Sequence, residues 1–339
     1  MPKILIVSPN WIGDALLAQP LLARLLQKYP GAAIDALAPA WTAPVLRRMP
    51  QIAEVIDAPF AHGELGLGAR LRLAAKLRAR RYDEAFVLPN TLKSALIPFL
   101  AGIPVRTGFV GELRYGLLNR VHRLEKPTLP LMAERYAQLA EAPGAPVQRP
   151  LIDVKLRVDP ENLSGALSRL GLERSKPMVA FCPGAEYGPA KRWPARHFAE
   201  LAITLAARGR AVWLFGSGKD NDIGEQVVHL SRGTSVNLCG KTDLASAIDL
   251  LSLAEVVVSN DSGLMHVAAA VGRPVVALYG SSSPEHTPPL SRTARLVSIG
   301  IDCSPCYARE CPLGHFKCMN DLAPARVLGE IESLPPGAQ

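Results

Sequence analysis

The chain has 339 residues, 48% hydrophobic and 20% charged, which is the composition of a globular protein long enough for two domains. Its longest unbroken apolar stretch, residues 95–105, is about half the length of a membrane-spanning helix, which needs about 20 residues, so a spanning segment is excluded. The net charge of +8 is uneven: residues 1–150 carry 19 Lys and Arg against 11 Asp and Glu, whereas residues 151–339 carry 19 of each.

The basic first half predicts an anionic partner: nucleic acid, a phosphate-rich substrate or an acidic membrane surface. A charge that serves only solubility is the alternative. The first residues hold a single short apolar run, residues 4–7, followed by Pro9. That run is shorter than a secretory signal requires, so we expect a cytoplasmic protein with reduced cysteines.

Strand-like and helix-like patterns alternate through the first half. Residues 3–9 contain a short apolar run typical of a buried strand, residues 10–14 predict a turn, and residues 15–29 have apolar positions at helical spacing. Further strand-like runs lie at residues 33–37, 53–56 and 84–88. This alternation predicts a parallel sheet with crossover helices.

A proline-rich linker, residues 143–160, leads into the second half, and its residues 151–158 predict an entering strand. The alternation then repeats. Strands are predicted at residues 178–182, 211–215, 236–238, 255–259, 274–279 and 295–299. Helices are predicted at residues 194–207, 220–230, 243–253 and 264–271. We therefore predict two α/β domains, residues 1–150 and 151–339, with ligands at the carboxyl ends of the strands.

The glycine-rich fingerprints of dinucleotide-binding and P-loop proteins, GxGxxG and GxxxxGK[ST], do not occur in the sequence. This disfavours a dehydrogenase and a P-loop nucleotidase.

Asp14 follows the first predicted strand, at the start of the first predicted helix. A carboxylate in that loop can act as a general base on a substrate hydroxyl, and a helix N-terminus favours its negative charge. The alternative is a plain helix N-cap, because Asp is a preferred capping residue.

Two loops at predicted strand ends have the residues of an anion site. Residues 181–194 run through small residues, including Gly184, to the adjacent cations Lys191 and Arg192. Backbone amides in such a loop bind anions and the cations add charge, so we predict a phosphate site. Solvated cations before a helix are the alternative.

The second such loop is residues 259–270. Asp261 and Ser262 are capping residues, Gly263 allows a ligand to approach the backbone, and His266 lies one turn into the helix. Two anion loops in one domain favour a ligand with a diphosphate. An ordinary capped helix with a core histidine is the alternative.

Four cysteines lie close together near the end of the chain, at positions 303, 306, 311 and 318. In a reducing compartment this spacing predicts a structural zinc site at Cys303, Cys306, Cys311 and Cys318. A packed cluster of free thiols is the alternative, and the spacing fits none of the common ferredoxin patterns.

Residues 64–81 predict a basic amphipathic helix, with leucines on one side and six Lys and Arg residues, at positions 70, 72, 76, 78, 80 and 81. Such helices lie on anionic membranes or bind anionic substrates, although a solvated helix face is the alternative. Aromatic residues are not interleaved with the charges, which disfavours binding of single-stranded nucleic acid.

Taken together and in this order, six segments resemble the ADP-heptose:lipopolysaccharide heptosyltransferases. They are SPNWIGDALLAQPLL (8–22), LPNTLKSALIPFLAGIPVRTGF (88–109), GELRYGLLN (111–119), CPGAEYGPAKRWP (182–194), SNDSGLMHVAAAVGRPVVALYG (259–280) and TPPLS (287–291). The resemblance spans nearly the whole chain.

The resemblance implies a GT-B fold, in which two Rossmann-like domains with parallel sheets face each other across a cleft. It implies an inverting, metal-independent transfer of heptose from ADP-heptose, with no required cofactor, onto the heptosyl-Kdo2-lipid A inner core. The donor would bind the C-terminal domain and the polyanionic acceptor the basic N-terminal one. We accordingly expect peripheral contact with the anionic inner membrane and no nucleic-acid partner.

The resemblance also implies roles for particular residues. Asp14 would be the general base, and Lys191 would bind phosphate and stabilise the leaving ADP. Donor-binding residues are expected at Gly184, Lys191, Gly216, Asp220, Asp222, Asp261, Ser262, Gly263 and His266, with Asp220 or Asp222 on the ribose. Acceptor-binding residues are expected at Asn90, Lys93, Arg106 and Arg114.

One departure from the family pattern follows the last core strand, where the family often has Pro-Thr or Pro-Ser after Tyr-Gly. Here Gly280 is followed by Ser281 and Ser282, from which we expect a small local effect. Three other functions remain open: transfer from another nucleotide sugar, sugar binding by a two-domain solute-binding protein, and nucleic-acid binding. Competition between ADP and UDP, turnover, and the salt dependence of binding would distinguish them.

Overall fold

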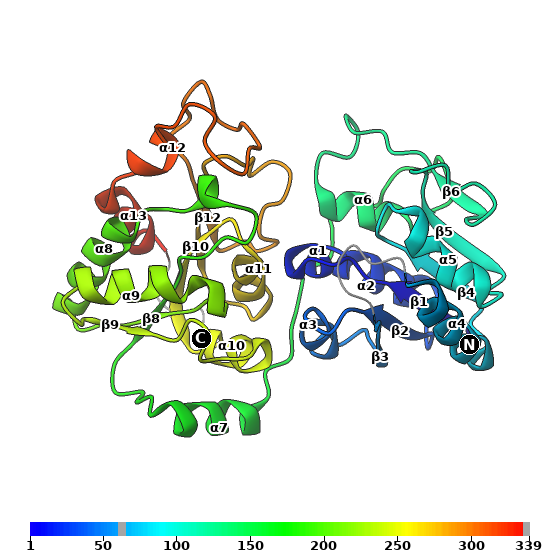
Figure 1. The fold of residues 1–339 in the computed structure, drawn as a ribbon, viewed down its shortest axis with the longest axis horizontal. Helices are drawn as coiled ribbons and strands as arrows, with labels where there is room; N and C mark the ends of the chain where they lie inside the picture. Colours follow the sequence, from blue (N-terminus) through cyan, green and yellow to red (C-terminus); the bar gives the residue numbers. More distant parts are fainter. Residues whose placement is uncertain (60–65, 335–339) are drawn as a thin grey trace. The chain divides into compact units, whose positions relative to one another are not determined.

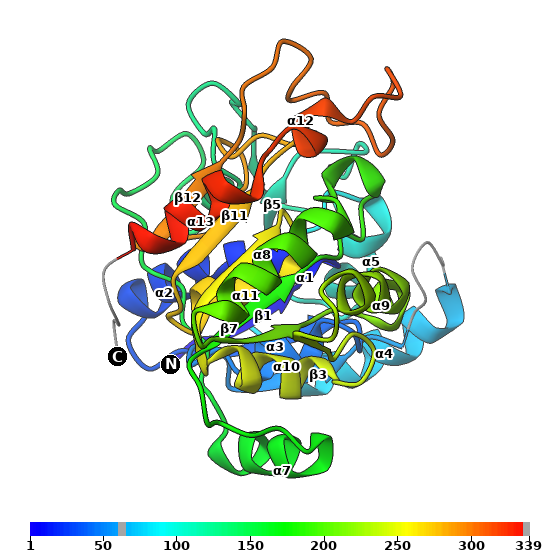
Figure 2. The same ribbon diagram turned by 90° about the vertical axis from the view of Figure 1, so that its left-hand side faces the viewer.

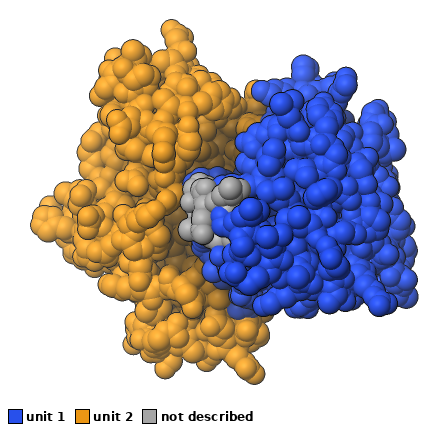
Figure 3. Space-filling model, turned by 45° about the vertical axis from the view of Figure 1, so that its right-hand side comes forward, with its two compact units in different colours: residues 1–154 blue, residues 155–339 orange. Residues whose placement is uncertain are grey.

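The computed structural model describes residues 1–59 and 66–334. The chain forms two compact units, residues 1–154 and 155–339 (Figure 3). Each unit contains one six-stranded parallel sheet whose strands alternate along the chain with helices (Figure 1). This is the predicted α/β fold. No helix in the described ranges is long and apolar enough to cross a membrane.

The sheet of the first unit has the strand order β3-β2-β1-β4-β5-β6. Its strands are β1 (Lys3–Val7), β2 (Ala33–Ala38), β3 (Glu54–Asp57), β4 (Glu84–Val87), β5 (Val105–Phe109) and β6 (Arg120–His122). Its helices are α1 (Ile12–Leu17), α2 (Gln19–Lys28), α3 (Ala43–Arg47), α4 (Leu67–Arg80), α5 (Leu92–Leu100) and α6 (Met132–Gln138). The direction of winding reverses between the adjacent strands β1 and β4, which is where open α/β sheets bind ligands.

The sheet of the second unit repeats this topology, with the order β12-β11-β10-β7-β8-β9. Its strands are β7 (Met178–Cys182), β8 (Ala211–Leu214), β9 (Ser235–Asn237), β10 (Ala254–Asn260), β11 (Val275–Leu278) and β12 (Ala294–Val297). Its α-helices are α7 (Pro160–Leu170), α8 (Ala195–Ala207), α9 (Asn221–Leu230), α10 (Leu244–Leu251), α11 (Gly263–Ala270), α12 (Lys317–Asn320) and α13 (Pro324–Glu332), and two short 3₁₀ turns lie at Pro189–Lys191 and Gly218–Asp220. Here the winding reverses between β7 and β10.

Several predicted elements differ from the observed ones. The single helix predicted over residues 15–29 is two helices, because Pro20 lacks the N–H that a continuous helix needs and instead starts α2. Residues 151–158 are not assigned to a strand, so that prediction was wrong. The helix predicted over residues 64–81 is observed as Leu67–Arg80, and residues 64 and 65 lie outside the described residues.

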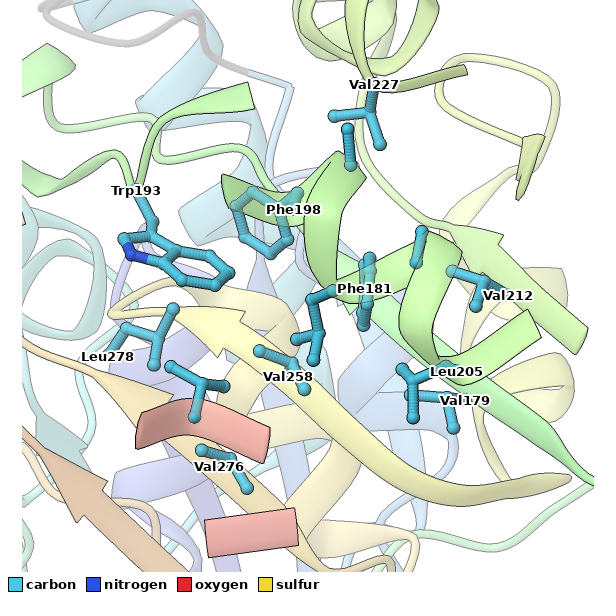
Figure 4. Close-up of a cluster of buried hydrophobic side chains, with 14 of the residues drawn as sticks. Val179, Phe181, Trp193, Phe198, Leu205, Val212, Val227, Val258, Val276 and Leu278 are labelled. Atoms are coloured by element: carbon cyan, nitrogen blue, oxygen red, sulfur yellow. The ribbon is translucent and has the colours of Figure 1, made fainter. Parts of the chain in front are cut away.

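The core of the second unit packs α8 and its preceding tryptophan onto strands β7, β10 and β11 (Figure 4). Trp193 is fully buried, and its ring meets Phe198 edge-on with 4.8 Å between the centroids. The Trp193 indole N–H donates to the Leu322 carbonyl at 2.8 Å. The segment that carries Lys191 is thus fixed directly to the hydrophobic core at its carboxyl end.

Candidate active site

The carboxyl ends of β7 and β10 lie side by side in the sheet of the second unit, because Ser259 pairs with Cys182 in the parallel register. The two loops predicted to bind anions follow these strands. They therefore begin at the same edge of the sheet, at the point where the winding reverses. The structure brings together two segments that are separated by about 70 residues in sequence.

An ion pair joins the two loops. The Lys191 ammonium lies 2.6 Å from Oδ2 of Asp261. The Asp261 side chain is 6% exposed and that of Lys191 18%. The hydroxyl of Ser282, from the loop after β11, donates to the same carboxylate oxygen at 2.6 Å. A buried carboxylate is stable only when it is paired or hydrogen-bonded, and this one has both kinds of partner.

Asn260, the last residue of β10, fixes the geometry of this pair. Its side-chain amide donates to the Pro183 carbonyl at 2.7 Å, and its side-chain carbonyl accepts the Trp193 backbone N–H at 3.0 Å. Asn260 is completely buried. The loop after β7 is therefore tied at both ends to the strand that presents Asp261, which sets the position of Lys191 between them.

His266 lies in α11 and is 5% exposed. Burial lowers its pKa to about 4, while the nearby charges of Asp261 and Lys191 act in opposite directions. The imidazole is therefore neutral at pH 7 and offers hydrogen bonds rather than charge. Ser262 is the N-cap residue of α11 without a side-chain cap bond, and its hydroxyl lies 3.2 Å from that of Ser259. The helix begins at Gly263.

Asp220 stabilises its own loop. Its carboxylate accepts the backbone N–H and the hydroxyl of Ser217 at 2.9 and 2.8 Å. It also packs against Gly184, where a Cβ atom would lie 2.4 Å from the carboxylate, and against Gly216. The loops after β7 and β8 are thereby packed together. Asp222 is exposed in the first turn of α9, and a ribose contact of either aspartate stays a prediction.

In the first unit, Asp14 lies half-buried in the first turn of α1. The N-cap residue is Trp11, so the prediction that Asp14 could be the N-cap is wrong. The helix N-terminus still favours its negative charge. Tyr136 of α6 is close by: burial first, and then the negative charge of Asp14, raises the pKa of this phenol well above its usual value. The neighbouring tyrosine is therefore neutral.

The residues predicted to bind the acceptor divide into two groups. Asn90 is exposed just after β4, and Lys93 is half-buried in α5. The guanidinium of Arg114, which is 1% exposed, donates to Asn90 Oδ1 at 2.8 Å and to the Phe109 carbonyl at 2.6 Å. Arg106 similarly donates to the Ile103 and Leu117 carbonyls, both at 2.6 Å.

Burial lowers the pKa of both arginines. Arg106 and Arg114 both hold loops of the first unit, and a contact of any of the four residues with the acceptor stays a prediction.

The four clustered cysteines are free thiols in the structure. The pKa of Cys318 is raised by burial and then by the neighbouring Cys303, Cys306 and Cys311, so the four side chains lie near one another. Within residues 1–59 and 66–334, however, no three His, Cys, Asp or Glu side chains are arranged to hold a metal ion. The arrangement of the four cysteine side chains therefore does not fit the predicted zinc site.

The basic face predicted on α4 is smaller than expected. Arg70 is buried and donates to the Lys93 carbonyl, Arg78 donates to the Leu100 carbonyl, and Arg80 forms a bidentate pair with Glu54. The exposed cations of this segment are those at positions 72, 76, 78 and 81, the last being the C-cap residue of α4.

Comparison with known proteins decides the family. The model of glycosyltransferase family 9 (heptosyltransferase) matches residues 70–317. Lipopolysaccharide heptosyltransferase 2 of Escherichia coli (strain K12) is 46% identical over 341 residues, which cover 98% of each chain. The chain belongs to glycosyltransferase family 9, the heptosyltransferases. The predicted family and its activity, the transfer of heptose to the lipopolysaccharide inner core, are confirmed.

Solved structures confirm the GT-B fold. The structure of E. coli ADP-heptose LPS heptosyltransferase II has a TM-score of 0.88 and 44% identity, covering 98% of both chains. E. coli heptosyltransferase WaaC with ADP has a TM-score of 0.72 and 21% identity, covering 97% of this chain and 99% of the other, and shares the fold.

Two residues that hold this candidate site together were not singled out from the sequence. Asn260 is adjacent to Asp261 but reads only as a polar residue at a strand end. Ser282 was noted as part of a departure from the family pattern with a small expected effect, yet it hydrogen-bonds the central carboxylate. The available signal was position: Asn260 ends a core strand and Ser282 lies in the loop that follows one, and ligand-binding loops lie at these strand ends.

Proposed function

We propose that this heptosyltransferase uses ADP-heptose as donor and heptosyl-Kdo2-lipid A as acceptor, and that it inverts the anomeric carbon of the transferred heptose. The observation that carries the proposal is the pair of Lys191 and Asp261 at the winding reversal of the second sheet. One cation and one carboxylate match the two parts of a nucleotide sugar: an anionic diphosphate and a sugar with several hydroxyl groups. The E. coli relative is an ADP-heptose LPS heptosyltransferase II, which supports the same donor.

In this proposal the donor binds the second unit. Lys191 and backbone amides of the loops at Gly184 and Gly263 bind the diphosphate, and Asp261 accepts hydrogen bonds from heptose hydroxyls. His266, neutral at pH 7, adds hydrogen-bonding capacity without adding charge. The acceptor meets the first unit, whose sequence carries the excess of Lys and Arg. Asn90 and Lys93 are the direct contacts that we propose there.

The reaction is a single displacement. Asp14 takes the proton of the acceptor hydroxyl as that oxygen forms a bond to the anomeric carbon of heptose. The bond between that carbon and the β-phosphate oxygen breaks, and its electron pair leaves with ADP. Lys191 stabilises the negative charge that develops on the leaving phosphate. Attack from the face opposite the leaving group inverts the anomeric configuration.

The experiment that tests this function measures ADP released by the purified protein from ADP-heptose, with and without heptosyl-Kdo2-lipid A, in EDTA. We expect release that depends on the acceptor and persists in EDTA, because Lys191 supplies the positive charge in this mechanism. UDP-sugars should not replace the donor. Turnover with UDP-sugars but not with ADP-heptose would contradict the proposed donor, and sugar binding without any turnover would contradict an enzyme.

We further propose a cytoplasmic location with peripheral contact to an anionic membrane, through the first unit. The net charge of residues 1–150 and the exposed cations of α4 and its C-cap, at positions 72, 76, 78 and 81, support it. Co-sedimentation should occur with vesicles rich in anionic lipid, weaken as salt rises, and be absent with zwitterionic vesicles. Equal binding to both vesicle types would contradict an electrostatic contact.

A further inference from the structure

The loop after β11 carries Ser282 and is held firmly in place. The Ser304 hydroxyl donates to the Gly280 carbonyl at 2.6 Å, and the Tyr307 backbone N–H donates to the Ser281 carbonyl at 2.6 Å. A Cβ atom at Gly280 would lie 2.5 Å from the sulfur of Met319, so any other residue there would displace this buried side chain. Residues 304–319, within the segment that contains the four clustered cysteines, therefore pack against the loop after β11. These contacts fix the position of Ser282 beside Asp261.

Two donors share one oxygen of Asp261. The Lys191 ammonium and the Ser282 hydroxyl each lie 2.6 Å from Oδ2. Within the two described ranges, Oδ1 of Asp261 receives no hydrogen bond from the protein. The carboxylate is therefore oriented by its Oδ2 and presents Oδ1 as the acceptor for a ligand.

Binding of a nucleotide sugar would change which donors the Asp261 carboxylate has. Its diphosphate competes with Asp261 for the Lys191 ammonium, because both are anions. When Lys191 turns to the phosphate, the carboxylate of Asp261 is still largely buried, and a buried carboxylate without a donor is costly. Ser282 is a neutral donor on a different loop, so the charge of the diphosphate does not attract it as it attracts the Lys191 ammonium. The Ser282 hydroxyl therefore keeps its hydrogen bond to Oδ2.

We propose that Ser282 is a positioning residue: it keeps the Asp261 carboxylate oriented toward the sugar of the donor while Lys191 binds the diphosphate. The inference rests on the proposed function, since it assigns the sugar to Asp261 and the diphosphate to Lys191. It follows that Ser282 acts on recognition of the sugar and not on recognition of ADP.

The chain offers a matched control next to this residue. Ser281 is 1% exposed, and its buried hydroxyl has no hydrogen-bond partner among the described residues. Ser281→Ala removes the same atom from the same loop without removing a hydrogen bond. Ser282→Thr keeps a hydroxyl at the critical position.

The experiment measures the Kd of ADP and of ADP-heptose by calorimetry, together with KM and kcat, for the wild type and the three variants. A hydrogen bond to a charged group corresponds to roughly a tenfold to hundredfold change in affinity. Ser282→Ala should therefore weaken ADP-heptose binding and raise its KM by about that factor. The Kd of ADP should stay within about twofold, and kcat should change less than KM. Ser281→Ala should match the wild type, and Ser282→Thr should restore most of the affinity.

Each other result is informative. Equal weakening of ADP and ADP-heptose by Ser282→Ala, accompanied by a lower Tm, would mean that Ser282 only supports the fold and would overturn the proposal. Unchanged binding of both ligands would also overturn it, leaving the donor assignment intact. If the wild type itself bound ADP but gained nothing from the heptose, the proposed donor would fail, and the role of Ser282 with it.

Discussion

Asp14→Asn is expected to abolish heptose transfer while leaving ADP binding nearly intact. Asparagine has the shape of aspartate but cannot accept the proton of the acceptor hydroxyl at neutral pH, so the displacement loses its base. A general base contributes typically 10²–10⁴-fold, and we expect kcat to fall by about that range. The measurement is acceptor-dependent ADP release, with the Kd of ADP determined on the same preparation.

The control for this variant is Asp57→Asn, which makes the same chemical change in the same unit. Asp57 pairs with Arg47 at 2.9 Å on the surface, with its side chain 62% exposed, and such pairs are worth about 0–1 kcal/mol. Its transfer rate should equal that of the wild type. If Asp14→Asn also kept near-normal turnover, Asp14 would only stabilise the first turn of α1, and the base would lie elsewhere.

The elements that the sequence predicted well are those whose signal is local. Strand β7 was predicted at its observed bounds because residues 178–182 are a continuous apolar run, as in any strand buried on both faces. The other five strands of the second unit were placed within two residues at each end. Strands β5 and β6 were not predicted, because their short sequences, VRTGF and RVH, show neither an apolar run nor regular alternation.

The partners of individual side chains depend on tertiary contacts, which the sequence pattern does not show. An arginine reads as a charge available to a ligand, yet Arg106 and Arg114 direct their guanidinium groups to carbonyls of their own unit. The same limit applies to Ser282, whose partner lies 21 residues away on a neighbouring strand's loop. The strand predicted at residues 151–158 was wrong for a similar reason: the Leu156 backbone N–H donates to the carbonyl of Ala270, the last residue of α11, and not to a strand. Local pattern gives the loops of the site; the direction in which each side chain points depends on packing.

Lys191→Ala is expected to weaken donor binding and turnover together. This result would distinguish it from Asp14→Asn, which should affect turnover, and from Ser282→Ala, which should affect binding of ADP-heptose. The ammonium has two tasks in the proposed mechanism: it binds the diphosphate of the donor, and it stabilises the charge on the leaving ADP. Loss of one such stabilising donor costs about 10²–10³-fold in kcat. Its removal also leaves the buried Asp261 carboxylate without its cation, so that carboxylate would repel the diphosphate.

The measurement is again the Kd of ADP and ADP-heptose together with KM and kcat. ADP and ADP-heptose should both bind more weakly, in contrast to Ser282→Ala, which should affect ADP-heptose alone. Lys176→Ala is the control, because Lys176 is exposed just before β7, at the opposite edge of the sheet, and its loss changes the net charge equally. A wild-type affinity for ADP in Lys191→Ala would place the diphosphate away from Lys191, and the ion pair with Asp261 would then be a structural link between two loops.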